Sequence, residues 1–255
     1  SKDEIMKKSC NQAFKILVDT EESKNELVKY YNCPKEKISI QPFSPYLPNI
    51  KNLNQDNSLE NKKISNMIIQ KFVFYPAQFW SHKNHKYLIE ALNILKEKHN
   101  IKLNAIFCGK DKGNLEFVKK LVSEKNLNDQ IYFVDFVSEE EIVLLYKKCL
   151  ALVMPTYVAR STLPLYEAFY FKIPVFYSEN ILDKSLEKFV VTFDLNNFDS
   201  LAIKLKQFIG KEIDLREKIK NGNKYYLENC NKEKLSKNYT KVLNEYKFFK
   251  SIWKN

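Results

Sequence analysis

The sequence predicts an α/β fold, with a Rossmann-like parallel sheet covered by helices on both faces. From residue 71 onward, short apolar runs alternate with segments in which apolar residues recur at helical spacing. The apolar runs are continuous rather than alternating with polar residues, which is typical of strands buried on both faces of a sheet. Helical segments of about ten residues or more separate them, which favours parallel connections.

The expected strands and helices follow one another along the chain. Strands are predicted at residues 71–77, 102–109, 130–137, 150–155, 173–178 and 189–193. Helices are predicted between them at residues 84–99, 114–125, 138–149 and 163–171. Ser138 is expected to cap the third helix, because three glutamates follow it in the first turn and favour the positive end of the helix dipole.

The two ends of the chain have a different pattern. Residues 14–45 predict a separate strand–helix–strand unit with Thr20 as the helix cap. The tail carries an apolar face that requires a partner surface, formed by Leu235, Tyr239, Val242, Leu243, Tyr246 and Phe249. We therefore expect four parts: a strand–helix–strand unit (1–45), an Asn/Lys-rich linker (46–68), a Rossmann-like domain (69–231) and an amphipathic helix (232–255).

The positive charge consists almost entirely of lysine. The net charge is +11, yet Arg160 and Arg216 are the only arginines. Reading DNA bases and clamping phosphates favour arginine, so we expect no nucleic-acid partner. A solvated lysine surface is the simplest interpretation; attraction to an anionic membrane surface or an anionic small ligand is the alternative.

The cysteines and apolar runs indicate a cytoplasmic protein. The five cysteines are scattered without a CxxC pair, which is typical of reduced thiols rather than disulfides or a zinc site. No apolar run approaches the ~20 residues of a membrane span, and no signal segment opens the chain. The chain begins at Ser1 rather than at methionine, so we expect it to be a piece of a longer protein.

A first candidate ligand site precedes the helix at 163–171. The sequence has four glycines and neither GxGxxG nor a Walker A motif, which excludes an ordinary dinucleotide or P-loop site. Ser161, Thr162 and Leu163 lead instead into Pro164, whose missing N–H suits a first helical turn, so the amides of Thr162 and Leu163 could face an anion. Glu167 lies one turn further and could accept hydrogen bonds from a vicinal diol; alternatively, it only favours the helix dipole.

A second candidate cluster follows the strand at 71–77. Lys83 lies at the same predicted edge of the sheet and could neutralise a diphosphate. His82 and His85 have an HxxH spacing, but the only other histidine, His99, ends the helix, so we expect no metal. The alternative for His85 is that it opens the helix while Phe79 and Trp80 pack the loop.

These segments, in this order, resemble the C-terminal, donor-binding half of a GT-B glycosyltransferase of the retaining family 4 (group 1). The likeness rests on FYPAQFWSHKNHKYLIEAL, IFCGKDKGN, IYFVDFVSEEEIVLLYKKCLALVMPTY and LPLYEAFYFKIPVFYS. Residues 16–43 resemble the last strand–helix–strand of the N-terminal lobe, and the tail resembles the helix that crosses back to it. The resemblance implies that most of the N-terminal, acceptor-binding lobe is missing from this chain.

The resemblance also implies roles for individual residues. Glu167 matches the second glutamate of the E-x7-E motif, which holds the ribose, and Lys83 matches the lysine that supports the departing diphosphate. The amides of Thr162 and Leu163, preceded by Ser161, match the diphosphate cradle. The remaining donor-binding positions are Gln78, Gly109, Lys110, Phe136 and Val137. No metal or other cofactor is implied.

Two positions depart from the family pattern. The first glutamate of E-x7-E falls at Ala159, and Gln78 stands where an arginine is usual.

The expected function is retaining transfer of a sugar from a nucleotide-diphospho-sugar to a hydroxyl of a glycan or lipid-linked acceptor in surface polysaccharide (capsule) synthesis. This piece alone is expected to be inactive. The alternatives are a non-catalytic nucleotide-sugar-binding module and, less favoured because no second acid/base carboxylate is evident, a nucleotide-sugar epimerase. The basic surface also raises the hypothesis of peripheral contact with the inner face of a membrane.

Overall fold

The computed structural model describes residues 1–45, 67–135, 137–158, 163–179 and 184–252. Three of the predicted site residues, Phe136, Ser161 and Thr162, lie outside the described residues, as do Ala159 and most of the expected linker.

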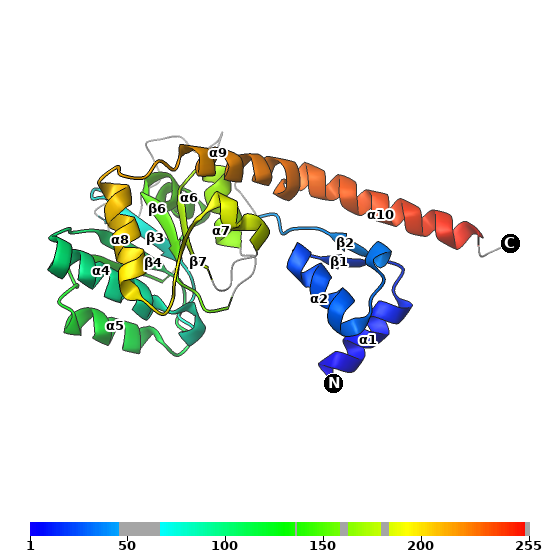
Figure 1. Cartoon of the computed structure of the whole chain (residues 1–255), viewed down its shortest axis with the longest axis horizontal. Coiled ribbons are helices and arrows are strands. Elements are labelled where there is room, and N and C mark those ends of the chain that lie inside the picture. Colours follow the sequence, from blue (N-terminus) through cyan, green and yellow to red (C-terminus); the bar gives the residue numbers. More distant parts are fainter. Residues whose placement is uncertain (46–66, 136, 159–162, 180–183, 253–255) are drawn as a thin grey trace.

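Within these ranges, six strands form one parallel sheet in the order β5-β4-β3-β6-β7-β8 (Figure 1). The strands are β3 (Phe72–Pro76), β4 (Asn104–Cys108), β5 (Ile131–Val134), β6 (Ala151–Met154), β7 (Val175–Ser178) and β8 (Val191–Phe193). Every residue of β4, β6 and β7 is buried, which is why these strands have no polar alternation.

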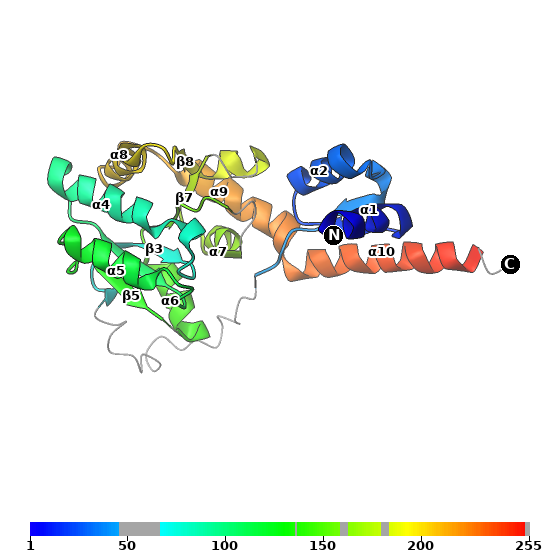
Figure 2. The ribbon, with the colours of Figure 1, turned by 90° about the horizontal axis from the view of Figure 1, so that it is seen from below.

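Helices cover both faces of the sheet, and the predicted α/β fold is thereby confirmed. The helices are α4 (His85–His99), α5 (Leu115–Glu124), α6 (Glu139–Lys148), α7 (Leu163–Phe171), α8 (Phe198–Ile209) and α9 (Arg216–Tyr225). Helix α4 packs beside α5 and α8 on one face, and α7 packs beside α6 and α9 on the other (Figures 1 and 2). Helices α8 and α9 had not been anticipated from the sequence.

A capping box at Ser138 determines where helix α6 begins. Ser138 Oγ accepts a hydrogen bond from the amide of Glu141 at 3.2 Å, and the Glu141 carboxylate accepts one from the amide of Ser138 at 2.8 Å. This reciprocal capping box satisfies two helix-end donors and confirms the predicted cap. Helix α6 therefore begins at a defined residue, and its last turn returns the chain to β6.

The N-terminal residues form a small unit of their own. It contains α1 (Lys2–Gln12), β1 (Ile16–Val18), α2 (Glu21–Tyr31), a 3-10 turn η1 (Lys35–Lys37) and β2 (Ile38–Ile40), with β1 and β2 paired in parallel. Thr20 caps α2 by accepting the amide of Ser23 at 3.0 Å, as predicted. The small core of this unit consists of Cys10, Leu27, Cys33 and Ile38.

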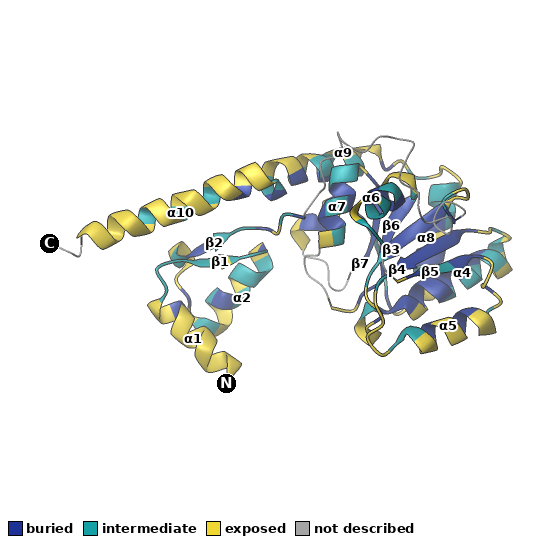
Figure 3. Cartoon of the chain, turned by 180° about the vertical axis from the view of Figure 1, so that it is seen from behind, coloured by how far each residue is buried: buried dark blue, intermediate teal, exposed yellow. Residues whose placement is uncertain are grey.

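A long helix, α10 (Lys232–Ile252), follows a π-helical turn at Tyr226–Cys230 and runs beside the N-terminal unit (Figures 1 and 2). Its aromatic face meets Phe14, whose ring centroid lies 5.5 Å from that of Tyr246 and 5.2 Å from that of Phe249. The rest of the helix is largely exposed, although Leu235 near its start is buried (Figure 3). None of the described helices has the length and apolarity needed to cross a bilayer.

All five cysteines lie in the described residues and are free thiols. Cys10, Cys33, Cys108 and Cys230 are buried, and burial raises the pKa of Cys108 and of Cys230 to about 12. Four of the five thiols are thus shielded within the two cores.

Phe193 should be a major contributor to stability at the sheet edge formed by β8. Its side chain is fully buried and its ring stacks on Tyr87 of α4 with centroids 5.3 Å apart. We expect Phe193→Ala to lower the free energy of unfolding by about 3–5 kcal/mol, because it leaves a cavity under α4. Urea denaturation measures this. The control, Phe117→Ala at a position 52% exposed on α5, should cost less than about 1 kcal/mol; equal losses would contradict the assignment of Phe193 to the core.

Candidate functional site

The order of the strands reverses between β3 and β6. The chain proceeds from β3 outward through β4 to β5, then returns to β6 and proceeds in the opposite direction through β7 to β8. At such a switch point the two loops leaving the carboxyl ends of the central strands diverge, and parallel α/β sheets bind ligands in the crevice between them. Here these are the loop after β3, residues 77–84, and the loop after β6, which begins at Pro155. Lys83 and Gln78 lie in the loop after β3, and Leu163 and Glu167 lie in α7, the helix that follows β6 in the chain.

Backbone hydrogen bonds tie the two loops together. The carbonyl of His82 accepts the amide of Tyr157 at 2.9 Å and the hydroxyl of Thr156 at 3.2 Å. The hydroxyl of Tyr75, from β3, donates to the carbonyl of Lys83 at 2.7 Å. The backbone that carries Lys83 is therefore held from both sides, by β3 and by the loop after β6.

Lys83 ends a 3-10 turn, η3 (Ser81–Lys83), and is half-buried. Burial lowers the pKa of its ammonium group, because a charged amine is less well solvated there than in water. No carboxylate among the described residues forms an ion pair with it. A cation held in a partly desolvated position without a partner attracts an anionic ligand more strongly than a fully solvated lysine does.

Gly109 and Lys110, which follow β4, lie against the start of the loop after β3, next to Gln78. The amide of Phe79 donates to the carbonyl of Lys110 at 3.0 Å, and a Cβ on Gly109 would lie 2.5 Å from the carbonyl oxygen of Ala77. Only glycine permits this approach of the two backbones. The side chain of Gln78 accepts the indole N–H of Trp80 at 2.9 Å. Gln78 is exposed and therefore places a neutral amide, rather than a charged group, on this loop.

Glu167 lies in the second turn of α7, and Pro164 lies in the first turn as predicted. The glutamate is half-buried, and its Oε2 accepts the hydroxyl of Tyr146, from α6, at 2.5 Å. Burial raises the pKa of Glu167, while the hydrogen bond from Tyr146 opposes this shift. The glutamate is thus more than a dipole-favouring acid at the helix end. Tyr146 had not been singled out in the sequence, because its place among the apolar residues of α6 marks it only as a core position.

The remaining predicted residues are less closely connected. Leu163 begins α7 and is 44% exposed. Val137 is half-buried, packs against the main core and follows β5, two strands away from β3. Lys83 and Glu167 lie in the two loop–helix segments of the switch point but form no ion pair with each other. The structure thus brings Gly109 and Lys110 against the start of the loop that also carries Gln78 and Lys83.

The two histidines of the HxxH spacing lie in different environments. His85 is fully buried and its ring contacts those of Tyr75, Phe79 and Phe107, with centroids 4.5–5.2 Å away. His82 is exposed and stacks on Trp80, with centroids 6.1 Å apart. In the part of the chain that the structure describes, no group of three or more His, Cys, Asp or Glu side chains could hold a metal ion. His85 is a packing residue at the start of α4.

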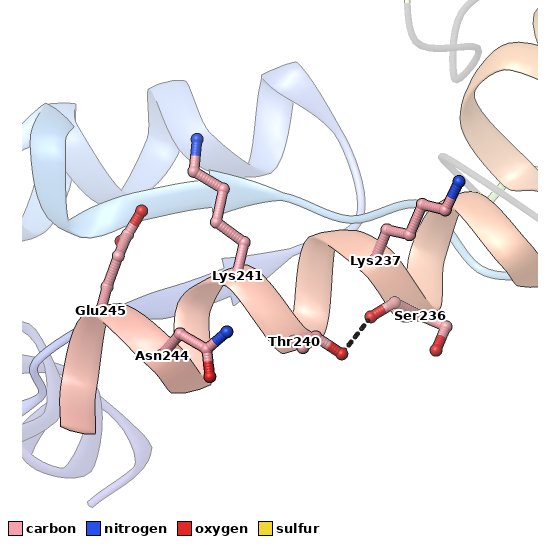
Figure 4. A pocket seen from close by; sticks show the side chains of 6 residues that line it. All are labelled: Ser236, Lys237, Thr240, Lys241, Asn244 and Glu245. Carbon is pink, nitrogen blue, oxygen red and sulfur yellow. Dashed lines mark hydrogen bonds between the residues drawn. The ribbon is translucent and has the colours of Figure 1, made fainter. Parts of the chain in front are cut away.

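Among the hollows that lie away from the switch point in the described residues, two contrast in shape. One, of about 210 Å³, lies between the N-terminal unit and the large domain and is lined by Asp19, Thr20, Glu21, Ile40, Tyr166, Ser185, Leu186 and Tyr225. The other is an open groove of about 450 Å³ along α10, lined by Ser236, Lys237, Thr240, Lys241, Asn244 and Glu245 (Figure 4). The groove is formed by one helix alone and contains none of the predicted site residues. The first hollow includes Tyr166, the neighbour of Glu167 in the sequence.

Comparison with known proteins places the chain in a family. Residues 59–225, a span that contains both loops, match the model of the family described as "Glycosyl transferases group 1". The chain belongs to this family. A curated relative, the O-antigen chain mannosyltransferase RfbU of Salmonella typhimurium (strain LT2), is 25% identical over 175 residues, which cover 69% of this chain and 45% of that protein.

Solved glycosyltransferase structures share the fold. A glycosyltransferase from Rickettsia africae superposes with a TM-score of 0.73 at 16% identity, covering 98% of this chain and 68% of the other. Anabaena HepE, solved in complex with UDP, superposes with a TM-score of 0.74 at 12% identity, covering 93% and 65%. These likenesses confirm a GT-B fold for this group 1 glycosyltransferase chain, which spans less than half the length of its curated relative.

Gly109 should be required for the shape of the loop after β3. Gly109→Ala places a methyl group against the backbone of Ala77, so the loop must move or the strand must shift. We expect a loss of about 1–3 kcal/mol in the free energy of unfolding. Gly210→Ala is the control, since its methyl would meet first the rotatable carboxylate of Glu212. Chemical denaturation of both variants checks this, and an unchanged Gly109→Ala midpoint would contradict the close approach.

His85 should make stability depend on pH. Burial lowers the pKa of His85 to about 3 in the folded protein, whereas a solvated histidine has a pKa of about 6.5. Between these values the unfolded chain binds the proton more readily, so His85 lowers the folding stability as the pH falls from 6.5 towards 3. We expect His85→Leu to flatten urea-derived stability against pH in this window. His82→Gln, at an exposed imidazole, should change the slope much less; equal slopes for His85→Leu and the unmodified chain would contradict the prediction.

Proposed function

We propose that this chain is the donor-binding portion of a family 4, retaining glycosyltransferase. The enzyme transfers a sugar from a nucleotide-diphospho-sugar to a hydroxyl of a glycan or lipid-linked acceptor. The observation that carries the proposal is that Lys83 follows β3 and Glu167 lies in the helix after β6, the two strands at the switch point, because this is where a parallel sheet binds an anionic ligand. The similarity to RfbU supports a role in surface polysaccharide synthesis, such as an O-antigen or capsule.

The proposed reaction assigns each group a task. The ammonium group of Lys83 neutralises charge that develops on the diphosphate as its bond to the sugar breaks. The amides of Thr162 and Leu163 add hydrogen bonds to the same phosphates, and Gln78, Ser161, Gly109 and Lys110 line the donor cleft. The carboxylate of Glu167 holds the ribose diol, while Phe136 and Val137 pack by the base. The diphosphate departs on the face that the acceptor hydroxyl attacks, with no covalent enzyme intermediate and no metal ion.

In this proposal the acceptor binds on the side of the large domain that faces the N-terminal unit. The hollow of about 210 Å³ between that unit and α7 supports this, since an acceptor must reach the sugar from outside the donor cleft. We propose that most of the acceptor-binding lobe belongs to a longer protein, so this chain alone binds the donor without turning it over. Peripheral contact with the inner, anionic face of the cytoplasmic membrane agrees with the net charge of +11.

A second candidate function is a nucleotide-sugar-binding module without transfer activity. The amide of Gln78 is bonded to Trp80 and presents no cation at the position where the family usually has an arginine. Sugar transfer by the longer protein, assayed with a radiolabelled donor and a lipid-linked acceptor, separates the two functions: measurable turnover supports the enzyme, and donor binding without turnover supports the module.

Nucleoside diphosphates should bind at Lys83 and Glu167. In calorimetric titration with UDP, GDP, ADP and CDP, we expect one to bind, and Lys83→Ala and Glu167→Ala each to weaken that binding about tenfold, or about 1.4 kcal/mol. The reason is the loss of a phosphate-neutralising charge in one variant and of a diol acceptor in the other.

Two surface variants provide matched controls. Lys98→Ala and Glu90→Ala break ion pairs with Asp199 and Lys125 away from the switch point and should leave affinity unchanged. Absence of binding to all four nucleotides by the folded chain, or equal losses in the controls, would contradict the proposed donor site.

A further inference from the structure

The hydrogen bond between Tyr146 and Glu167 joins two helices beneath the proposed donor site. Tyr146 is in the last turns of α6, Glu167 is in the second turn of α7, and the phenol oxygen lies 2.5 Å from Oε2 of the carboxylate. Tyr146 is buried, whereas Glu167 is half-buried. Among the described residues, no hydrogen bond occupies the other carboxylate oxygen, Oε1. One oxygen is thus held by Tyr146, and the other has no hydrogen-bond partner among the described residues.

The ring of Tyr146 is fixed by its neighbours. It meets Phe74 of β3 edge-on, with centroids 5.1 Å apart, and stacks on Phe171 of α7, with centroids 5.3 Å apart. A buried ring packed on two sides has little rotamer freedom. Its hydroxyl therefore occupies one position relative to both β3 and α7, and the carboxylate bonded to it is restrained in turn.

The same bond affects the charge of Glu167. Burial raises the pKa of this glutamate, and the hydrogen bond donated by Tyr146 favours the ionised form. The phenol keeps its proton and remains able to donate, because burial and the neighbouring carboxylate keep its pKa well above the ordinary value. Among the described residues, the other titratable groups that act on the Tyr146 phenol are the thiols of Cys108, from β4, and Cys149, after α6, and burial raises the pKa of both.

We propose that Tyr146 is a positioning residue for nucleotide recognition: its hydroxyl holds one oxygen of Glu167 so that the other accepts hydrogen bonds from the ribose diol. The inference rests on the proposed function, since it requires that Glu167 bind the ribose. It adds a residue that does not touch the ligand itself. A hydrogen bond made only for packing would stabilise the fold without affecting the preference for a ribose hydroxyl.

The test compares nucleotides with and without the diol. UDP, GDP, ADP and CDP are titrated into the chain, each against its 2′,3′-dideoxy form, and the ratio of the two affinities measures recognition of the diol. We expect the unmodified chain to favour the ribonucleotide by about tenfold, Glu167→Ala to abolish the preference, and Tyr146→Phe to reduce it to about twofold. Tyr87→Phe is the control, because it removes an equally buried hydroxyl that donates to the carbonyls of Asp194 and Asn197 at 2.6 Å.

A pH series of the same ratio provides a second readout. A protonated Glu167 is a poorer acceptor, so the preference for ribose should be lost as the pH falls through the pKa of this carboxyl group. Without the hydroxyl of Tyr146 that pKa is higher, so Tyr146→Phe should lose the preference at a higher pH than the unmodified chain. Titration of the phosphates affects both nucleotides alike and cancels in the ratio.

The outcomes separate the two proposals. A normal ratio and pH profile in Tyr146→Phe, with Glu167→Ala impaired, overturns the positioning role while the donor site stands. An unimpaired Glu167→Ala, or binding of none of the four nucleotides, overturns both. A reduced ratio in Tyr146→Phe supports the inference only if Tyr87→Phe retains the ratio of the unmodified chain; equal reductions in both variants overturn it.

Discussion

The pairing of β3 with β6 determines where the two functional loops meet. Val73 lies opposite Ala151 and Phe74 opposite Leu152, and the amide of Leu150 donates to the carbonyl of Phe72 at 2.8 Å. Both strands are buried and parallel, so both end at the same edge of the sheet. Because their connections then run in opposite directions, this edge is the switch point, the place at which parallel α/β sheets bind ligands. Every polar contact of the candidate site lies on one of these two segments or is bonded to it.

The site depends on the backbone more than is usual for a charged binding site. The carbonyls of His82 and Lys83 are both hydrogen-bonded, so the loop that carries the lysine is restrained before any ligand binds. Gly109 permits the neighbouring strand to approach this loop closely. Such preorganisation lowers the conformational entropy lost on binding. The chain has few glycines and no glycine-rich phosphate loop, so this loop is restrained by hydrogen bonds instead.

Burial removes both Lys83 and Glu167 partly from water, but the two charges are compensated differently. Lys83 is desolvated without an ion-pair partner among the described residues, which favours a ligand of opposite charge. Glu167 is desolvated too, but it accepts a hydrogen bond from the hydroxyl of Tyr146, which stabilises the ionised carboxylate. The proposed donor site assigns the first group to the anionic part of a nucleotide and the second to its hydroxyls.

The sequence by itself determined the class of fold, and it indicated the segments of the candidate site. Continuous apolar runs are required wherever a strand is covered on both faces, so the six strands were predictable, as were the caps at Ser138 and Thr20, which depend on neighbours a few residues away. Helices α8 and α9 escaped prediction although they complete the cover of the sheet. Tertiary structure alone decided that Tyr146 meets Glu167, that the carbonyl of His82 joins the two loops, and that His85 is a packing residue. Each of these contacts joins residues brought together by strand pairing and helix packing, and local periodicity carries no information about which distant side chains will meet.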